Sequence, residues 1–326
     1  MINRIGIRRA AVSALLACSA AFSPAYSQDA QGTGEGKPGK TGATVTRDGS
    51  RFAWIETNDG VKIEVTVEGR VEPNDDYTDV ASIPTDGRFT VEDNRTGVAR
   101  RYRVERGAGG GLARTYTVGG RERAPDAEAQ EWVRRVMLEA VRQGGLFAQE
   151  RAQKILRERG ARGLSEELTH LRGDHVRRLY FEALITSRDL DDATLAEALG
   201  SLRIGSDYER AQLLIKAADS LLGRDKLVPV YFEAVGKIGS DYEHRRVLSA
   251  LIRKGGLSAD ALVAAIRSVA GVGSDYEKAT WLIQVARLKH SDERVRAAFA
   301  EALRGIGSEY ERGRVERAAA GRAGAN

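Results

Sequence analysis

The residues that could act as metal ligands or nucleophiles are few and widely separated. The four histidines are His170, His175, His244 and His290, and no two of them have the spacing of a zinc site on one helix. Cys18 is the only cysteine, and it lies in a segment that we expect to be removed or lipidated. These residues predict neither a metal centre nor cysteine chemistry.

Acidic and glycine-rich stretches resemble ligand loops but lack the complete motifs. The run NDDYTD at residues 74–79 has neither the central glycine nor the final glutamate of a calcium loop. The runs GTGEGKPGK and GAGGG match no P-loop or dinucleotide fingerprint, and the chain has no Gly-x-Ser-x-Gly elbow. We therefore predict a protein that is not an enzyme, with no catalytic residues, cofactor or metal.

One phrase with hydroxyl, acidic and aromatic groups recurs. GSDYE or GSEYE begins at residues 205, 239, 273 and 307, so its period is 34 residues. Serine and glutamate three residues apart form a capping box, in which each side chain bonds the backbone N–H of the other residue at a helix start. The acid between them places negative charge where the helix dipole favours it. The predicted capping residues are Ser206, Glu209, Ser240, Glu243, Ser274, Glu277, Ser308 and Glu311.

Capping does not explain two other features of the phrase. Each copy contains a tyrosine, whose ring we expect to pack against the neighbouring repeat, with a binding row as the alternative. A basic residue follows two positions later, which favours a solvated face with weak ion pairs over a recognition stripe. The candidate partner-binding residues under the alternative are Tyr208, Tyr242, Tyr276, Tyr310, Arg210, His244, Lys278 and Arg312.

The elements that must position these residues fall into two groups. Between residues 47 and 123 apolar and polar residues alternate, and turns rich in Gly, Asn and Asp separate the runs, which predicts an antiparallel meander of about six strands. From residue 124 to 326 the apolar period is helical, and the 34-residue repeat predicts stacked helical hairpins. The predicted fold class is α+β: an antiparallel β-meander domain followed by a HEAT-like α-solenoid.

The amino-terminal residues predict export. Residues 1–27 combine three arginines, the apolar run AAVSALLACSAAF and the small residues AYS, as in a signal peptide cleaved after Ser27. The alternative is a lipoprotein anchored through Cys18 in the sequence LLAC; we favour cleavage because the apolar run continues past Cys18. Residues 28–46, rich in Gly, Thr and Lys, read as a flexible linker. No later run is long and apolar enough to predict a transmembrane segment in the mature chain.

The strand domain, the helix beginning DAEAQEWVRRVM and the GSDYE hairpins together resemble exported bacterial proteins that join a β domain to HEAT-like repeats. Similar modules are fused to membrane zinc metallopeptidases of the beta-lactam-sensor type. The resemblance covers roughly residues 50–316, but its motifs are structural, and the His-Glu-x-x-His motif of such peptidases is absent here. It therefore implies no catalytic residues.

These observations lead to two functional hypotheses. The first is a non-enzymatic periplasmic or cell-envelope protein that binds a protein or peptide partner, or acts as a scaffold, because solenoids offer extended binding surfaces. The alternative, implied by the resemblance, is a regulatory accessory of a membrane metallopeptidase or envelope-stress sensor. Nucleic acid is not an expected partner, since loss of the three amino-terminal arginines lowers the net charge from +5 to +2.

Overall fold

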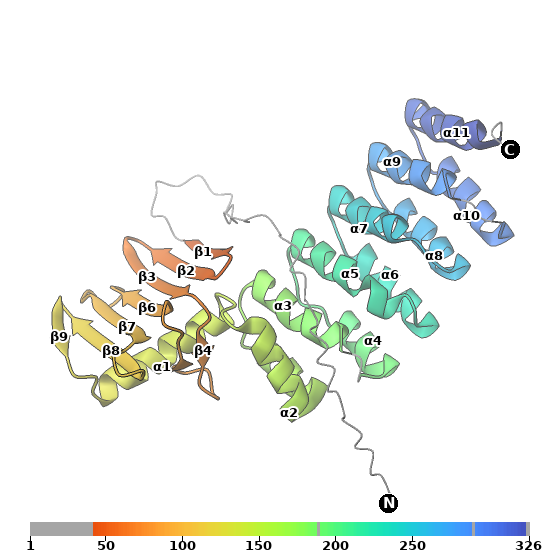
Figure 1. Ribbon diagram of the computed structural model, residues 1–326. Coiled ribbons are helices and arrows are strands. Elements are labelled where there is room, and N and C mark those ends of the chain that lie inside the picture. Colours follow the sequence, from red (N-terminus) through yellow and green to blue (C-terminus); the bar gives the residue numbers. More distant parts are fainter. Residues whose placement is uncertain (1–41, 188–189, 289–290, 324–326) are drawn as a thin grey trace, which may run out of the picture.

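The computed structural model describes residues 42–187, 190–288 and 291–323. An antiparallel sheet comes first, and helices stacked in two layers follow it (Figure 1). The predicted α+β fold class, with strands before helices, is confirmed. The predicted signal peptide, Cys18 and the linker up to residue 41 lie outside the described residues.

The main sheet has seven strands in the order β1-β2-β3-β6-β7-β8-β9, and every neighbouring pair is antiparallel. The segment between β3 and β6 forms a separate two-stranded antiparallel sheet of β4 (Glu72–Pro73) and β5 (Val80–Ser82). The strands of the main sheet are β1 (Gly42–Asp48), β2 (Arg51–Asn58), β3 (Val61–Glu68), β6 (Arg88–Asp93), β7 (Arg100–Arg106), β8 (Leu112–Val118) and β9 (Arg121–Arg123).

The first strand begins inside the segment predicted as linker. β1 starts at Gly42, whereas the predicted linker extends to residue 46. The β-branched residues Thr44, Val45 and Thr46 favour extended backbone. They pair with the central residues of β2, so the sheet extends one strand further than the alternation of the sequence predicts.

The core of the sheet continues into the first helix. One face of the strands carries buried residues such as Trp54, and α1 (Ala127–Arg142) covers that face with Trp132, Val136 and Met137. The Trp54 ring fits against Gly144, where an added Cβ would lie 2.7 Å from the Trp54 Cγ atom. The cluster therefore extends beyond residue 123, where the sequence places the end of the β domain.

The buried Asp93 carboxylate fixes α1 to the sheet. It accepts a hydrogen bond from Trp132 Nε1 at 3.1 Å and one from Arg95 Nε at 3.0 Å. Burial opposes the charged form, but the bonds from Arg95 and Trp132 outweigh it and lower the pKa of Asp93. Removing one donor would leave a buried charge undersatisfied.

The helices that follow form a two-layered solenoid. In each layer every helix contacts the next one, and the two layers run side by side in Figure 1. Helix α2 (Ala148–Leu168) precedes the array. The first layer contains α3 (Asp174–Ile185), α5 (Asp207–Leu221), α7 (Asp241–Lys254), α9 (Asp275–Ala286) and α11 (Glu309–Ala323). The second contains α4 (Asp192–Gly200), α6 (Val228–Gly236, after the 3₁₀ turn Asp225–Leu227), α8 (Ala259–Ala270) and α10 (Glu293–Arg304).

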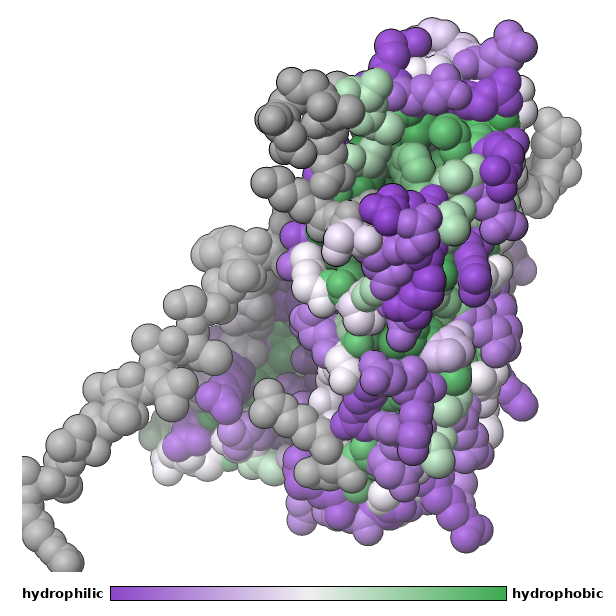
Figure 2. All heavy atoms as spheres, turned by 90° about the vertical axis from the view of Figure 1, so that its right-hand side faces the viewer, coloured by the Kyte–Doolittle hydropathy of each residue, from purple (hydrophilic) through white to green (hydrophobic). Residues whose placement is uncertain are grey.

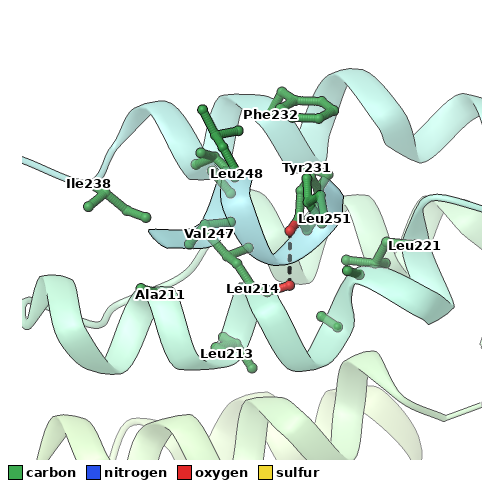
Figure 3. Packing of buried hydrophobic residues seen from close by; sticks show 14 of the residues in the cluster. Ala211, Leu213, Leu214, Leu221, Tyr231, Phe232, Ile238, Val247, Leu248 and Leu251 are labelled. Atoms are coloured by element: carbon green, nitrogen blue, oxygen red, sulfur yellow. Dashed lines mark hydrogen bonds between the residues drawn. The ribbon is translucent and has the colours of Figure 1, made fainter. Parts of the chain in front are cut away.

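The space between the layers is filled by side chains at equivalent repeat positions. Figure 3 shows this packing where α5, α6 and α7 meet, with the fully buried Tyr231 donating its hydroxyl to the Leu214 carbonyl at 3.0 Å. Leu214, Leu248 and Leu282 are 34 residues apart and completely buried. The equivalent residue of α11 is Glu316, which is exposed, as expected for a terminal repeat.

A buried ion cluster joins the sheet domain to the array. Glu167 on α2 accepts from Arg142 on α1 at 2.8 Å and from Arg151 at 2.5 Å. Arg151 also donates to the Tyr180 hydroxyl on α3 at 3.2 Å. Burial raises the pKa of Glu167, but the hydrogen bonds from Arg142 and Arg151 lower it by more. The Glu167 carboxylate and the Arg151 guanidinium together thus link three consecutive helices.

Figure 2 looks onto the side of the array where the second layer lies. Hydrophilic residues cover most of this face, and hydrophobic residues show mainly in the gaps between them. Among the described helices, none combines the length and the apolar character required to cross a bilayer.

Candidate functional site

The repeated phrase starts the first-layer helices with nearly identical geometry. Each serine oxygen accepts from the backbone N–H of the glutamate three residues later, at 3.3 Å in all four copies. The backbones of Ser206, Ser240 and Ser274 have φ between −77° and −72° and ψ between 115° and 118°. The side chains of the phrase therefore leave successive helices in the same direction.

The aspartate of each phrase bonds to the next repeat. Asp207 accepts from the backbone N–H groups of Gly239 at 3.1 Å and Ser240 at 2.8 Å. The sequence predicts that this aspartate serves only the dipole of its own helix, and that the serine N–H bonds to the glutamate of the same phrase. In the structure the serine N–H donates to the aspartate of the preceding repeat, so that half of the predicted capping box is wrong. We call this set of inter-repeat bonds the aspartate ladder; its equivalent bonds to serine N–H run from Asp174 to Ser206, Asp241 to Ser274 and Asp275 to Ser308, at 2.7–2.8 Å.

The glutamates of the phrase form ion pairs with arginines. Glu209 is buried and accepts from Arg178 at 2.5 Å, with His175 at 3.3 Å. Burial raises its pKa, but the His175 hydrogen bond and the Arg178 charge together lower the pKa to about 2. Glu277 likewise pairs with Arg245 of the preceding repeat, whereas Glu243 and Glu311 pair within their own helices, with Arg246 at 2.5 Å and Arg314 at 2.6 Å.

The tyrosines of the phrase are mostly exposed, which we did not expect. Tyr242, Tyr276 and Tyr310 are 54%, 56% and 71% exposed, and Tyr208 is half-buried. With Val98 in the sheet domain, these three are the large hydrophobic side chains that the described residues leave exposed. The prediction that the rings pack between repeats is therefore wrong for these three. We refer to the four residues as the tyrosine row.

Arginines lie over three of the four rings of the tyrosine row. The Arg246 guanidinium lies 5.1 Å from the ring centre of Tyr208 in the preceding repeat. Arg314 covers Tyr276 in the same way, at 5.5 Å, whereas Arg245 covers Tyr242 within its own helix, at 5.0 Å. These cation–π contacts restrict the rings without burying them. Sequence reasoning missed these arginines, although Arg245 stands three residues after Tyr242, a spacing that places both on one helix side.

The basic residues two positions after the tyrosines point elsewhere. Arg210 and Arg312 donate to the backbone carbonyls of Ile204 and Ile306, the latter at 3.0 Å, and Lys278 lies 3.4 Å from the Gly305 carbonyl. His244 is buried against α8. Two positions along a helix is a rotation of about 200°, so these side chains face the second layer. They do not form the recognition stripe considered for Arg210, His244, Lys278 and Arg312.

His244 and Ser268 form a pair with a superficial likeness to a catalytic dyad. His244 Nε2 lies 2.8 Å from Ser268 Oγ, beside a hollow of about 860 Å³ between α6 and α8. Burial lowers the pKa of His244, while the charge of Asp241 opposes this shift. In a triad a carboxylate orients the imidazole, but both Asp241 oxygens accept backbone N–H groups of Gly273 and Ser274. The pair therefore has the geometry of a contact between layers.

The acidic loop at residues 74–79 is held by hydrogen bonds between its own residues. Asn74 Oδ1 accepts from the backbone N–H of Thr78 at 2.8 Å and of Asp79 at 3.0 Å. Within the described ranges no three His, Cys, Asp or Glu side chains form a group able to hold a metal ion. The tyrosine row and the arginines over it are thus the remaining candidate for a functional site, because packing within the protein does not account for exposed rings at repeated positions.

Comparison of the chain with protein-family models, with curated proteins and with solved structures finds no match.

Proposed function

We propose that this protein is a non-enzymatic binding or scaffold protein of the cell envelope, and that it contacts a protein or peptide partner through the tyrosine row. The observation that carries the proposal is the repetition of an exposed aromatic residue at one position of successive stacked helices. Repeat arrays use such extended rows of equivalent positions to bind extended partners.

The composition of the row supports a binding role. Tyrosine and arginine are enriched at protein interfaces, where a tyrosine ring buries apolar area and its hydroxyl bonds at the edge. Both residue types occur at this surface, because arginine guanidinium groups lie 5.0–5.5 Å from the ring centres of Tyr208, Tyr242 and Tyr276. A partner would thus meet rings that have already lost part of their freedom, which lowers the entropic cost of binding.

The envelope location rests on the amino-terminal sequence pattern, which predicts cleavage after Ser27 or lipidation at Cys18. Mass spectrometry of the protein from its native host tests this part. A chain beginning at Gln28 or at a lipid-modified Cys18 agrees with the proposal, and a full-length cytoplasmic chain contradicts it.

Selection from a random peptide library tests the binding role. The wild-type protein and a triple variant, Tyr242→Ala with Tyr276→Ala and Tyr310→Ala, are immobilised and panned in parallel. We expect peptides that are enriched on the wild type and lost on the triple variant. Val98→Ala is the matched control, because Val98 is also exposed, at 47%, but lies in the sheet domain. Peptides bound equally by all three proteins, or no enrichment, would contradict the proposal.

A further inference from the structure

We infer that the ligand of the tyrosine row is a largely uncharged peptide segment in the polyproline II conformation, lying along the array with one turn per repeat. This inference rests on the proposed function and specifies the chemistry of its ligand. It follows from three properties of the row: its spacing, its charge and its hydrogen-bonding groups.

The spacing of the row matches polyproline II better than the other regular conformations. Successive first-layer helices are in contact, so equivalent residues recur about every 8–10 Å along the array. A polyproline II helix has three residues per turn and rises about 9 Å per turn, so every third residue faces a new tyrosine. In a β-strand, residues on one face recur about every 7 Å, so they no longer match the spacing of the tyrosines after one repeat.

An α-helical ligand fits the surface less well. Residues seven apart in an α-helix are about 10 Å apart, but the helix is 10–12 Å wide and binds in a groove with walls. Tyr242, Tyr276 and Tyr310 instead project from the surface, exposed by 54–71%. A narrow extended segment can lie between projecting rings, as proline-rich segments do on aromatic surfaces.

The charges beside the row are satisfied within the protein. Arg246 pairs with Glu243 at 2.5 Å, Arg314 pairs with Glu311 at 2.6 Å, and Arg245 pairs with Glu277. The glutamates of these pairs would repel an acidic ligand. A basic ligand would compete with the arginines that cover the rings, both for the glutamates and for the ring faces. An uncharged segment is complementary to this balanced surface because it leaves every pair intact.

The row also offers hydrogen-bond donors that such a ligand lacks. A polyproline II segment makes no internal hydrogen bonds, and its carbonyl oxygens remain free to accept. A tyrosine hydroxyl can donate one hydrogen bond to such an oxygen. Tyr242, Tyr276 and Tyr310 are 54–71% exposed, so their hydroxyls are accessible to ligand carbonyls.

Proline oligomers of two lengths test the inference by calorimetric titration. The four tyrosines span about 28 Å, which a ten-residue polyproline II segment covers. Decaproline should therefore bind at least about tenfold more tightly than tetraproline, which reaches two rings at most. Each Tyr→Ala change at positions 242, 276 or 310 should weaken decaproline binding about three- to tenfold, while Val98→Ala should leave it unchanged.

The controls separate this inference from the proposed function. Circular dichroism melts confirm that each variant is folded. An alanine-rich α-helical peptide of about 20 residues, which is long enough to be helical in water and spans about 30 Å, serves as the conformational control. Equal binding of the two proline oligomers, tighter binding of the helical peptide, or no decaproline binding would overturn the inference. The proposed function would still stand if library peptides depended on the tyrosines, and it would fall only if none did.

Discussion

The aspartate ladder makes a prediction that distinguishes it from ordinary helix capping. Asp207→Ala removes the acceptor for the Gly239 and Ser240 N–H groups of the next repeat, at 3.1 Å and 2.8 Å. Glu309→Ala is the matched control, because Glu309 occupies the same place in the phrase of α11, the last helix that the structure describes. Both changes remove a negative charge from a first helical turn.

The expected losses differ because, among the described residues, Asp207 accepts backbone N–H groups of a following repeat and Glu309 does not. The bond from the partly buried Ser240 N–H to a charged oxygen contributes about 1.5 kcal/mol or more. The first-turn charge adds about 0.5 kcal/mol, and the exposed Gly239 N–H regains a bond to water. Asp207→Ala should therefore lower the free energy of unfolding by about 2 kcal/mol, and Glu309→Ala by about 0.5 kcal/mol.

Urea unfolding followed by circular dichroism measures the two losses, and native-state hydrogen exchange locates them. In Asp207→Ala the amide of Ser240, which belongs to the next repeat, should exchange faster, although its own side chains are unchanged. If both variants lose the same stability, or if exchange at Ser240 is unaffected, the ladder contributes nothing beyond the helix dipole and the reasoning is refuted.

Three further predictions concern the tyrosines and two titrating groups. Tyr242→Ala should cost less than about 1 kcal/mol in thermal melts, because it removes an exposed ring and one cation–π contact, whereas Tyr231→Ala should cost about 3 kcal/mol or more through a core cavity; equal losses would contradict these placements. Burial lowers the pKa of His244 below 6.5, so the unfolded chain binds that proton more tightly. Stability should decline as the pH falls below 6.5, and His244→Gln should flatten this decline in pH-dependent melts. Burial opposes ionisation of Glu209, but His175 and Arg178 lower its pKa from 4.5 to about 2. The ionised Glu209 therefore stabilises the folded protein fully above pH 4.5, and this contribution is lost as the pH falls toward 2. Glu209→Gln should cost about 3 kcal/mol at pH 7 and weaken the acid dependence of unfolding, and an unchanged acid limb would count against the pairing.

Local patterns in the sequence predict the elements well because each element obeys a short period. Alternation in β3 places Ile63, Val65 and Val67 in the core, and the 34-residue recurrence of GSDYE marks the start of each first-layer helix. The extent of the sheet core is harder to predict, because α1 has the same helical period as the array. Only contacts made in the fold, such as the hydrogen bond from Trp132 to Asp93 and the shared core cluster, assign it to the sheet.

The directions of side chains in the phrase depend on helix rotation and on neighbouring repeats. Tyr208 and Ala217 are nine residues apart, a rotation of about 900°, so the ring lies opposite the buried Ala217. That relation was available in the sequence and argues against packing of the tyrosines. The bond from Asp207 to Ser240 was not available, because it depends on how closely two consecutive helix starts approach one another.

The aspartate ladder also gives the array a direction of growth. Every acceptor belongs to one repeat and every donor to the repeat after it, from Asp174 to Ser308. During synthesis, which proceeds from the amino terminus, each new helix start finds its acceptor already in place. Within the ladder, deletion of a repeat from the carboxyl end leaves a solvated carboxylate, whereas deletion from the amino end leaves the backbone N–H groups of a glycine and a serine without their acceptor. The ladder itself therefore loses little when the last repeat is removed, and the cost of that removal lies in the apolar residues of α9, such as Leu282, that α11 covers.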